Sequence, residues 1–89
     1  MTEREKMLSG ALYQAGAPEL VRARRKAKEL CRRFNLEAVR DPEAGERLLR
    51  ELLGAAGEDV TIQPMFWCDY GCHIRMGSHI EINHNCVIL

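Results

Sequence analysis

The residues most able to do chemistry gather in the last nineteen positions, GCHIRMGSHIEINHNCVIL. A zinc site needs about four ligands that converge at roughly 2.0 to 2.3 Å from the metal. Isoleucines recur at regular spacing through the same stretch, so it permits either a metal site or a repeat with a buried apolar series. The candidate ligands are Cys72, His73, His79, His84 and Cys86.

Counting in sixes favours the repeat. Each six-residue unit reads apolar, polar, apolar, and then three residues rich in glycine and asparagine, which enter tight turns at little cost. Alternation over only three residues, followed by a corner, predicts short strands wound around a three-sided prism rather than a hairpin. The first apolar series is Ile62, Cys68, Ile74, Ile80 and Cys86, and the second, two residues later, is Tyr70, Met76, Ile82 and Ile88.

This register predicts where the metal candidates lie. Three faces close one coil in eighteen residues, so Cys68 and Cys86 are expected at equivalent inward positions, about 4.8 Å apart, as small core hydrophobes. The other candidates fall on separate corners and face outward, so they do not converge on one ion. The sequence therefore predicts no metal ligand among Cys72, His73, His79 and His84.

The first part of the chain has a helical period instead. Thr2 followed by Glu5 is a capping-box pattern, and apolar residues recur at helical spacing after it. We expect this first helix to end between Tyr13 and Gly16.

Two further helices follow. Pro18 suits a first-turn position, and the apolar stripe after it predicts a second helix that ends near Phe34. Asp41 and Pro42 form a cap and first-turn pair that opens a third helix, with Gly54 as its stop. The expected fold is mixed α and β, with a helical segment at 1–57 and short strands at 58–89.

Composition bounds the class of protein. The chain has 89 residues, thirteen basic and thirteen acidic, so it is one domain with no net charge to favour nucleic acid or an acidic membrane. It has no apolar leader and no run of eighteen apolar residues, so we expect a cytoplasmic protein. Its four cysteines form no CxxC pair, and we expect no disulfide framework.

A basic run on the second helix is the strongest local charge. Seven cations lie within twelve residues, but acidic residues flank them and one aromatic residue is nearby. This pattern favours a solvated or partner-facing surface over a phosphate-binding one. The run comprises Arg22, Arg24, Arg25, Lys26, Lys28, Arg32 and Arg33.

The chain resembles a known family over essentially all of its length. The matching stretches are MTEREKMLSGALYQAGAPEL, RARRKAKELCRRFN, LLRELLG and IQPMFWCDYGCHIRMGSHIEINHNCVIL. They are similar to the N-terminal half of the maltose and galactoside O-acetyltransferases, which are hexapeptide-repeat acyltransferases. The resemblance implies a helical segment followed by the first one to two coils of a left-handed parallel β-helix, assembled as a homotrimer with active sites between subunits.

The resemblance also implies a reaction and its residues. In this family acetyl-CoA donates an acetyl group to a sugar hydroxyl of maltose, glucose or galactoside type, and a histidine acts as general base. That histidine and the coenzyme A site match segments beyond Leu89, so no residue of this chain is expected to be catalytic or cofactor-binding. Asp69 and Asn83 match acceptor-side positions and can bond sugar hydroxyls. His84 and Ala17 depart from the family pattern.

Three functions remain open from the sequence. The first is the acceptor-side part of a sugar O-acetyltransferase, inactive as an isolated chain. The second is a non-catalytic interaction module or a split-enzyme half, whose helices and open strand edge bind a partner chain. The third, weakest on the ligand geometry above, is a zinc module. Because about one and a half coils stack poorly alone, we expect the chain to be part of a longer repeat.

Overall fold

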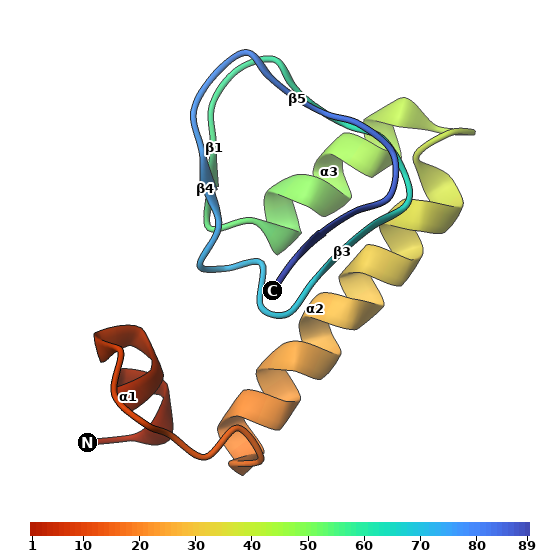
Figure 1. The fold of residues 1–89 in the computed structure, drawn as a ribbon. Coiled ribbons are helices and arrows are strands. Elements are labelled where there is room, and N and C mark those ends of the chain that lie inside the picture. The colour runs from red at the N-terminus through yellow and green to blue at the C-terminus, as the bar shows by residue number, and fades with distance from the viewer.

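The computed structural model describes all residues 1–89 and contains three helices followed by six short strands (Figure 1). The mixed α and β class is therefore confirmed. No helix is both long enough and apolar enough to cross a membrane. The helices are α1 (Glu3–Ser9), α2 (Pro18–Glu37) and α3 (Pro42–Leu52). The strands are β1 (Ala55–Ala56), β2 (Val60–Ile62), β3 (Phe66–Cys68), β4 (Arg75–Met76), β5 (Ile80–Ile82) and β6 (Cys86–Ile88).

Helix α1 starts as predicted but ends early. The Thr2 side chain accepts a bond from the Glu5 amide, and the Glu5 carboxylate accepts one from the Thr2 amide, which completes the capping box. The helix ends before Gly10, which adopts a left-handed conformation, so the predicted end between Tyr13 and Gly16 is wrong. None of its residues is buried, and no tertiary packing extends it past this glycine.

The other two helices begin at the predicted prolines. In α2 the stripe Leu20, Ala27, Leu30, Cys31 and Phe34 is buried, and the helix continues one turn past its predicted end to Glu37.

Helix α3 begins as predicted. The Asp41 carboxylate caps it by accepting a bond from the Ala44 amide at 3.2 Å. The helix ends at Leu52, and the chain is already extended at Leu53, before the predicted stop at Gly54.

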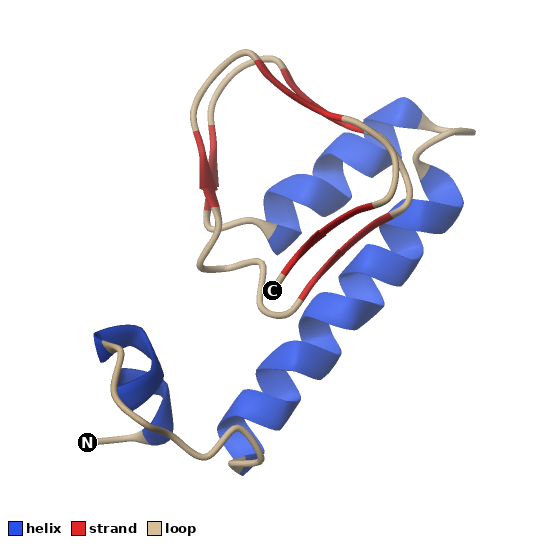
Figure 2. Cartoon of the chain, viewed as in Figure 1, coloured by secondary structure: helices blue, strands red, loops and turns tan.

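The six strands pair in parallel across the three sides of a winding path. Strand β1 pairs with β4, β2 with β5 and β3 with β6, as two-stranded sheets. Figure 2 shows the chain going round this three-sided path, with the strands of the first and second pass side by side. We call β1–β3 the first pass and β4–β6 the second pass. The parallel pairing, and not a hairpin, agrees with the prism expected from the hexads.

The register corrects the predicted coil length. Val60 lies opposite Ile80 and Phe66 opposite Cys86, so equivalent residues are 20 apart, not eighteen. Cys68 is therefore in register with Ile88, and the expected pairing of Cys68 with Cys86 is wrong. The same shift places Ile62 opposite Ile82.

The two additional residues lie in the corner between the passes. The hexad spacing holds through the second pass, whereas the corner at 69–73 is longer, and the predicted strand at 68–70 stops at Cys68. Gly71 adopts φ +67°, and a Cβ there would lie 2.5 Å from Leu52 Cδ1. In this longer corner the backbone passes closely over the end of α3.

One core joins the helices to the first pass. Eleven buried residues from α2, α3 and the chain through β3 form a single cluster, with Cys31 and Phe66 both 0 % exposed. The Asn35 side chain fastens α2 to β3, because its Oδ1 accepts from the Phe66 amide at 2.8 Å and its Nδ2 donates to the Phe66 carbonyl at 3.1 Å. The helical and repeat segments thus share a core.

Candidate functional site

The two predicted site residues lie at different corners of the winding path. Asp69 follows β3, and Asn83 follows β5. They therefore flank opposite ends of the side formed by β3 and β6, and the structure does not bring them together within one chain.

The Asp69 carboxylate is available to a ligand. The residue is half-buried, and its carboxylate has no hydrogen-bonding or ion-pair partner. A half-buried carboxylate without a partner retains free acceptor positions, which a hydroxyl group can fill. Its neighbours in the corner, by contrast, are held by several contacts.

An arginine from α2 fixes this corner. Arg24 donates from Nη1 to the Tyr70 hydroxyl and from Nη2 to the Ala15 carbonyl, each at 2.8 Å. Its guanidinium carbon also lies 5.9 Å from the centre of the Tyr70 ring. Tyr70 is the residue after Asp69, so Arg24 holds the backbone that presents the carboxylate. The half-buried guanidinium has only neutral partners.

The prediction that the basic run forms a solvated or partner-facing surface is wrong for Arg24, which is half-buried against the chain's own residues. It lies four residues after Leu20 and three before Ala27, both of which are buried, and this spacing places it beside the buried face. The spacing was visible in the sequence and would have separated Arg24 from its neighbours. Arg32, in contrast, stays on the exposed face and pairs with Glu29, with Nε 3.0 Å from Oε2.

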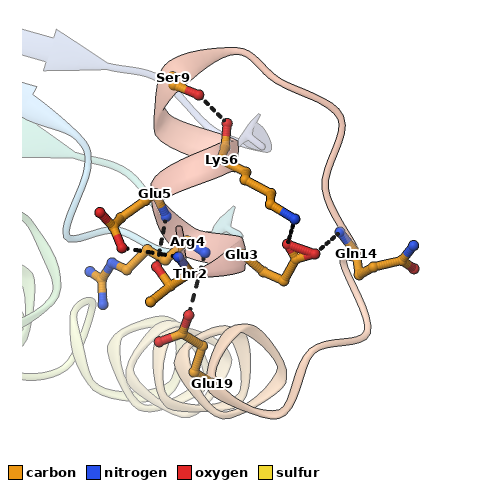
Figure 3. A network of polar contacts seen from close by, with 8 residues as sticks. All are labelled: Thr2, Glu3, Arg4, Glu5, Lys6, Ser9, Gln14 and Glu19. Carbon is orange, nitrogen blue, oxygen red and sulfur yellow. Dashed lines mark hydrogen bonds and ion pairs between the residues drawn. The ribbon is translucent and has the colours of Figure 1, made fainter.

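The short helix α1 reaches the same corner through polar contacts. The Arg4 guanidinium donates to Cys72 Sγ at 3.6 Å, and the Arg4 amide donates to a Glu19 carboxylate oxygen at 3.3 Å. Figure 3 shows the Glu19 contact with the capping box and the Glu3–Lys6 ion pair. Burial and the nearby Arg4 charge lower the pKa of His73, whose ring centre lies 5.8 Å from that of Tyr70.

The Asn83 corner is held mainly by its own residues. Asn83 Oδ1 accepts a bond from the His84 amide at 2.8 Å, which leaves the amide nitrogen of the exposed Asn83 side chain without a partner. His84 lies 2.7 Å, through Nδ1, from the Pro64 carbonyl of the first pass, and Asn85 has φ +63°. Asn83 thus acts as a turn residue with one donor group still free.

The five candidate metal ligands lie apart. Cys72 contacts Arg4, His84 contacts Pro64, and His79 Nδ1 lies 3.1 Å from an Asp59 carboxylate oxygen. No group of three or more histidine, cysteine, aspartate or glutamate side chains is placed to hold one ion. The Asp59–His79 contact joins equivalent corners of the two passes, and it becomes visible only when the 20-residue register is known.

A known protein family matches the helical part of the chain. Residues 6–57 match the family described as the maltose acetyltransferase hexapeptide capping motif. Nodulation protein L of Rhizobium meliloti strain 1021 is 41% identical to this chain over 88 residues. The matched region covers 99% of this chain and 48% of that protein.

Solved structures are similar over the whole chain. A hexapeptide-repeat-containing acetyltransferase of Vibrio cholerae O1 biovar eltor, complexed with acetyl coenzyme A, matches with a TM-score of 0.87 and 37% identity, and this chain covers 48% of it. A galactoside acetyltransferase in complex with coenzyme A matches with a TM-score of 0.92 and 27% identity, with 44% of that chain covered. The chain therefore spans about half the length of the proteins it matches.

Proposed function

The chain belongs to the maltose and galactoside O-acetyltransferases, a family of hexapeptide-repeat acyltransferases, and from this membership we propose that it forms the acceptor-binding half of an acetyl-CoA-dependent sugar O-acetyltransferase. One observation carries the proposal: the Asp69 carboxylate is half-buried, free of partners and held by a corner that Arg24 fixes. Such a group accepts a hydrogen bond from a sugar hydroxyl of maltose, glucose or galactoside type.

In the proposed reaction the sugar hydroxyl attacks the thioester carbonyl of acetyl-CoA. The hydroxyl proton passes to a general base, the acetyl group moves to the sugar oxygen, and the coenzyme A thiol leaves. Asp69 orients the hydroxyl-bearing sugar. The base and the coenzyme A contacts come from residues outside this chain. The acetyl-CoA and coenzyme A complexes of the two similar structures support this donor.

The positions of Asp69 and Asn83 support a site shared between copies. The two side chains flank opposite ends of one side of the winding path, so a single chain cannot place both on one sugar. In a homotrimer, the Asp69 corner of one copy faces the Asn83 corner of the next. The free amide nitrogen of Asn83 then donates to the same acceptor. The two passes are the first coils of a left-handed parallel β-helix, and the protein acts in the cytoplasm without nucleic acid or membrane.

A chimera tests this function directly. This chain replaces the segment that it matches in the Vibrio cholerae acetyltransferase, and the product is incubated with acetyl-CoA and a panel of maltose, glucose and galactosides. Mass spectrometry of the sugars measures acetyl transfer. We expect transfer to at least one sugar by the chimera and none by the isolated 89-residue chain.

Variants of the chimera assign the site. Asp69→Asn removes a charged hydrogen bond worth about 1.5 to 3 kcal/mol, so kcat/KM for the sugar should fall about ten- to a hundredfold while KM for acetyl-CoA stays unchanged. Asp59→Asn is the matched control, because Asp59 lies on another corner beside His79, and it should change kcat/KM less than about twofold. A chimera that folds and assembles but acetylates no sugar contradicts the proposal.

A second function is favoured by the half-buried second pass. Apolar side chains of β5 and β6, including Ile82 and Ile88, are only half-buried, which suits an interaction module or split-enzyme half covered by a partner chain. The test is complementation in trans with the second half of the Vibrio cholerae acetyltransferase. Activity restored by mixing two separate chains supports the split-enzyme function, and activity found only in the fused chimera opposes it.

A further inference from the structure

Two buried thiols face each other across the contact between α2 and β3. Cys31 is 0 % exposed and Cys68 is 3 % exposed, both are free, and their sulfur atoms lie 3.8 Å apart. We propose that Cys31 and Cys68 are a redox-modification site, at which a disulfide oxidant such as oxidised glutathione joins α2 to β3 through a disulfide bond. This inference does not depend on the proposed acetyltransferase function.

The contact between the two elements already places the sulfurs close to bonding distance. A disulfide is about 2.0 Å long, so the sulfurs need to approach by less than about 2 Å. Cys31 and Asn35 lie one helical turn apart on the same face of α2, and Phe66 and Cys68 lie two residues apart on the same face of β3. Because Asn35 already holds the Phe66 backbone through two hydrogen bonds, the adjacent thiol pair is held in register by an independent contact.

The chemistry balances with one oxidant molecule. The S–S bond of oxidised glutathione breaks, one cysteine first forms a mixed disulfide with a glutathione sulfur, and the second cysteine displaces that glutathione. The protein loses two S–H bonds and gains one S–S bond. Two molecules of reduced glutathione leave with the two protons. The two protein thiols are oxidised, and the glutathione disulfide is reduced.

The other two cysteines differ in their surroundings. Cys72 is exposed beside Arg4, and Cys86 is half-buried in β6 opposite Phe66, so neither has another sulfur in contact. These two can form mixed disulfides with glutathione but have no second thiol to displace it. Both sulfurs are shielded from solvent, so attack by glutathione requires α2 to separate briefly from β3. The hydrogen bond with Cys31 and burial also raise the pKa of the Cys68 thiol. The equilibrium is therefore a better measure than the rate.

The experiment compares this equilibrium in the folded and the unfolded chain. A Cys72→Ser/Cys86→Ala variant keeps only the two core thiols and is equilibrated in reduced and oxidised glutathione, with and without about 6 M guanidinium chloride. Acid quenching and mass spectrometry count species lighter by two hydrogen atoms. We expect the equilibrium constant for the internal disulfide to be at least about tenfold larger in the folded chain, because the fold holds the sulfurs together. By linkage, the oxidised form should also melt at a higher temperature.

Several results would overturn the inference. An equilibrium constant that is equal or smaller in the folded chain means that the fold opposes the bond, as does a lower melting temperature of the oxidised form. A Cys31→Ser variant in the same background should yield only a glutathione adduct at Cys68. If the double variant does not fold, the unaltered chain is oxidised and digested, and the absence of a peptide pair joined through Cys31 and Cys68 rejects the proposal.

Discussion

The two passes of the winding chain follow the same three-sided path, but the helices bury the first pass more completely than the second. In the first pass Ile62, Phe66 and Cys68 are buried beneath α2 and α3, whereas every apolar residue of β5 and β6 is half-buried or exposed. Both passes keep a six-residue step between successive strands, which end at 56, 62 and 68 in the first pass and at 76, 82 and 88 in the second. The repeat pattern therefore defines the path of the chain, and the helices determine which pass contributes most to the core.

The largest expected difference between the passes concerns two isoleucines in register. Ile62 is buried, and Ile82, directly opposite it, is half-buried. Ile62→Ala removes apolar contacts and leaves a cavity against the helices, so the free energy of unfolding should fall by about 3 to 4 kcal/mol. Ile82→Ala should cost only about 1 to 2 kcal/mol, because less of its surface is removed from water. Urea denaturation followed by circular dichroism measures both.

The isoleucine pair also tests whether the helices are what buries the first pass. The two substitutions delete the same atoms from equivalent positions on one sheet, so strand propensity cancels between them. Equal losses of stability, or a larger loss for Ile82, would mean that the core lies between the passes and not beneath the helices.

The corner that joins the passes gives the next largest effect. Gly71→Ala places a Cβ 2.5 Å from Leu52 Cδ1 and 2.6 Å from the Leu52 carbonyl oxygen, at φ +67°. The strained backbone and the overpacking together should cost about 2 to 3 kcal/mol in the free energy of unfolding. Gly77→Ala is the matched control at a second-pass corner, where a Cβ meets nothing within 4 Å, and it should cost less than about 0.5 kcal/mol.

Gly71 also explains why the register was predicted incorrectly. The count in sixes ran unbroken through the corner at 69–73, and it placed the partners of Ile62 and Cys68 two residues out of step with the observed pairs. Gly71 lies in the longer corner and packs closely on Leu52, and this contact joins segments that are far apart in sequence. A local period carries no signal for such a contact. If Gly71→Ala were as mild as Gly77→Ala, this explanation would fail.

Local signals, in contrast, were sufficient for the helix starts. The capping box of Thr2 and Glu5 and the prolines at 18 and 42 act within one turn, and all three were predicted correctly. The candidate site shows the same division. Asp69 and Asn83 were selected by resemblance, and their roles remain proposals, whereas the Arg24 contact to Tyr70 depends on tertiary packing and was missed.

The smallest expected effect is electrostatic and concerns the same corner. Burial and the Arg4 charge lower the pKa of His73 in the folded chain, while an unfolded histidine titrates near about 6.5. Because the lowered pKa belongs to the folded state, the stabilising contribution is present above the unfolded pKa and is lost as the pH falls through the folded pKa. We expect a small loss of stability below about pH 6.5 that His73→Gln removes.

The His73 ring reports this effect directly by NMR. Its titration midpoint, assigned by comparison with His73→Gln, should lie below that of the chain in denaturant. Arg4→Gln should raise the midpoint only part of the way, because burial is the larger cause and the Arg4 charge the smaller. A midpoint at or above the denatured value would show that neither desolvation nor the Arg4 charge disfavours the protonated form of the exposed His73 ring. A midpoint unchanged by Arg4→Gln would show that α1 does not act electrostatically on the corner that joins the two passes.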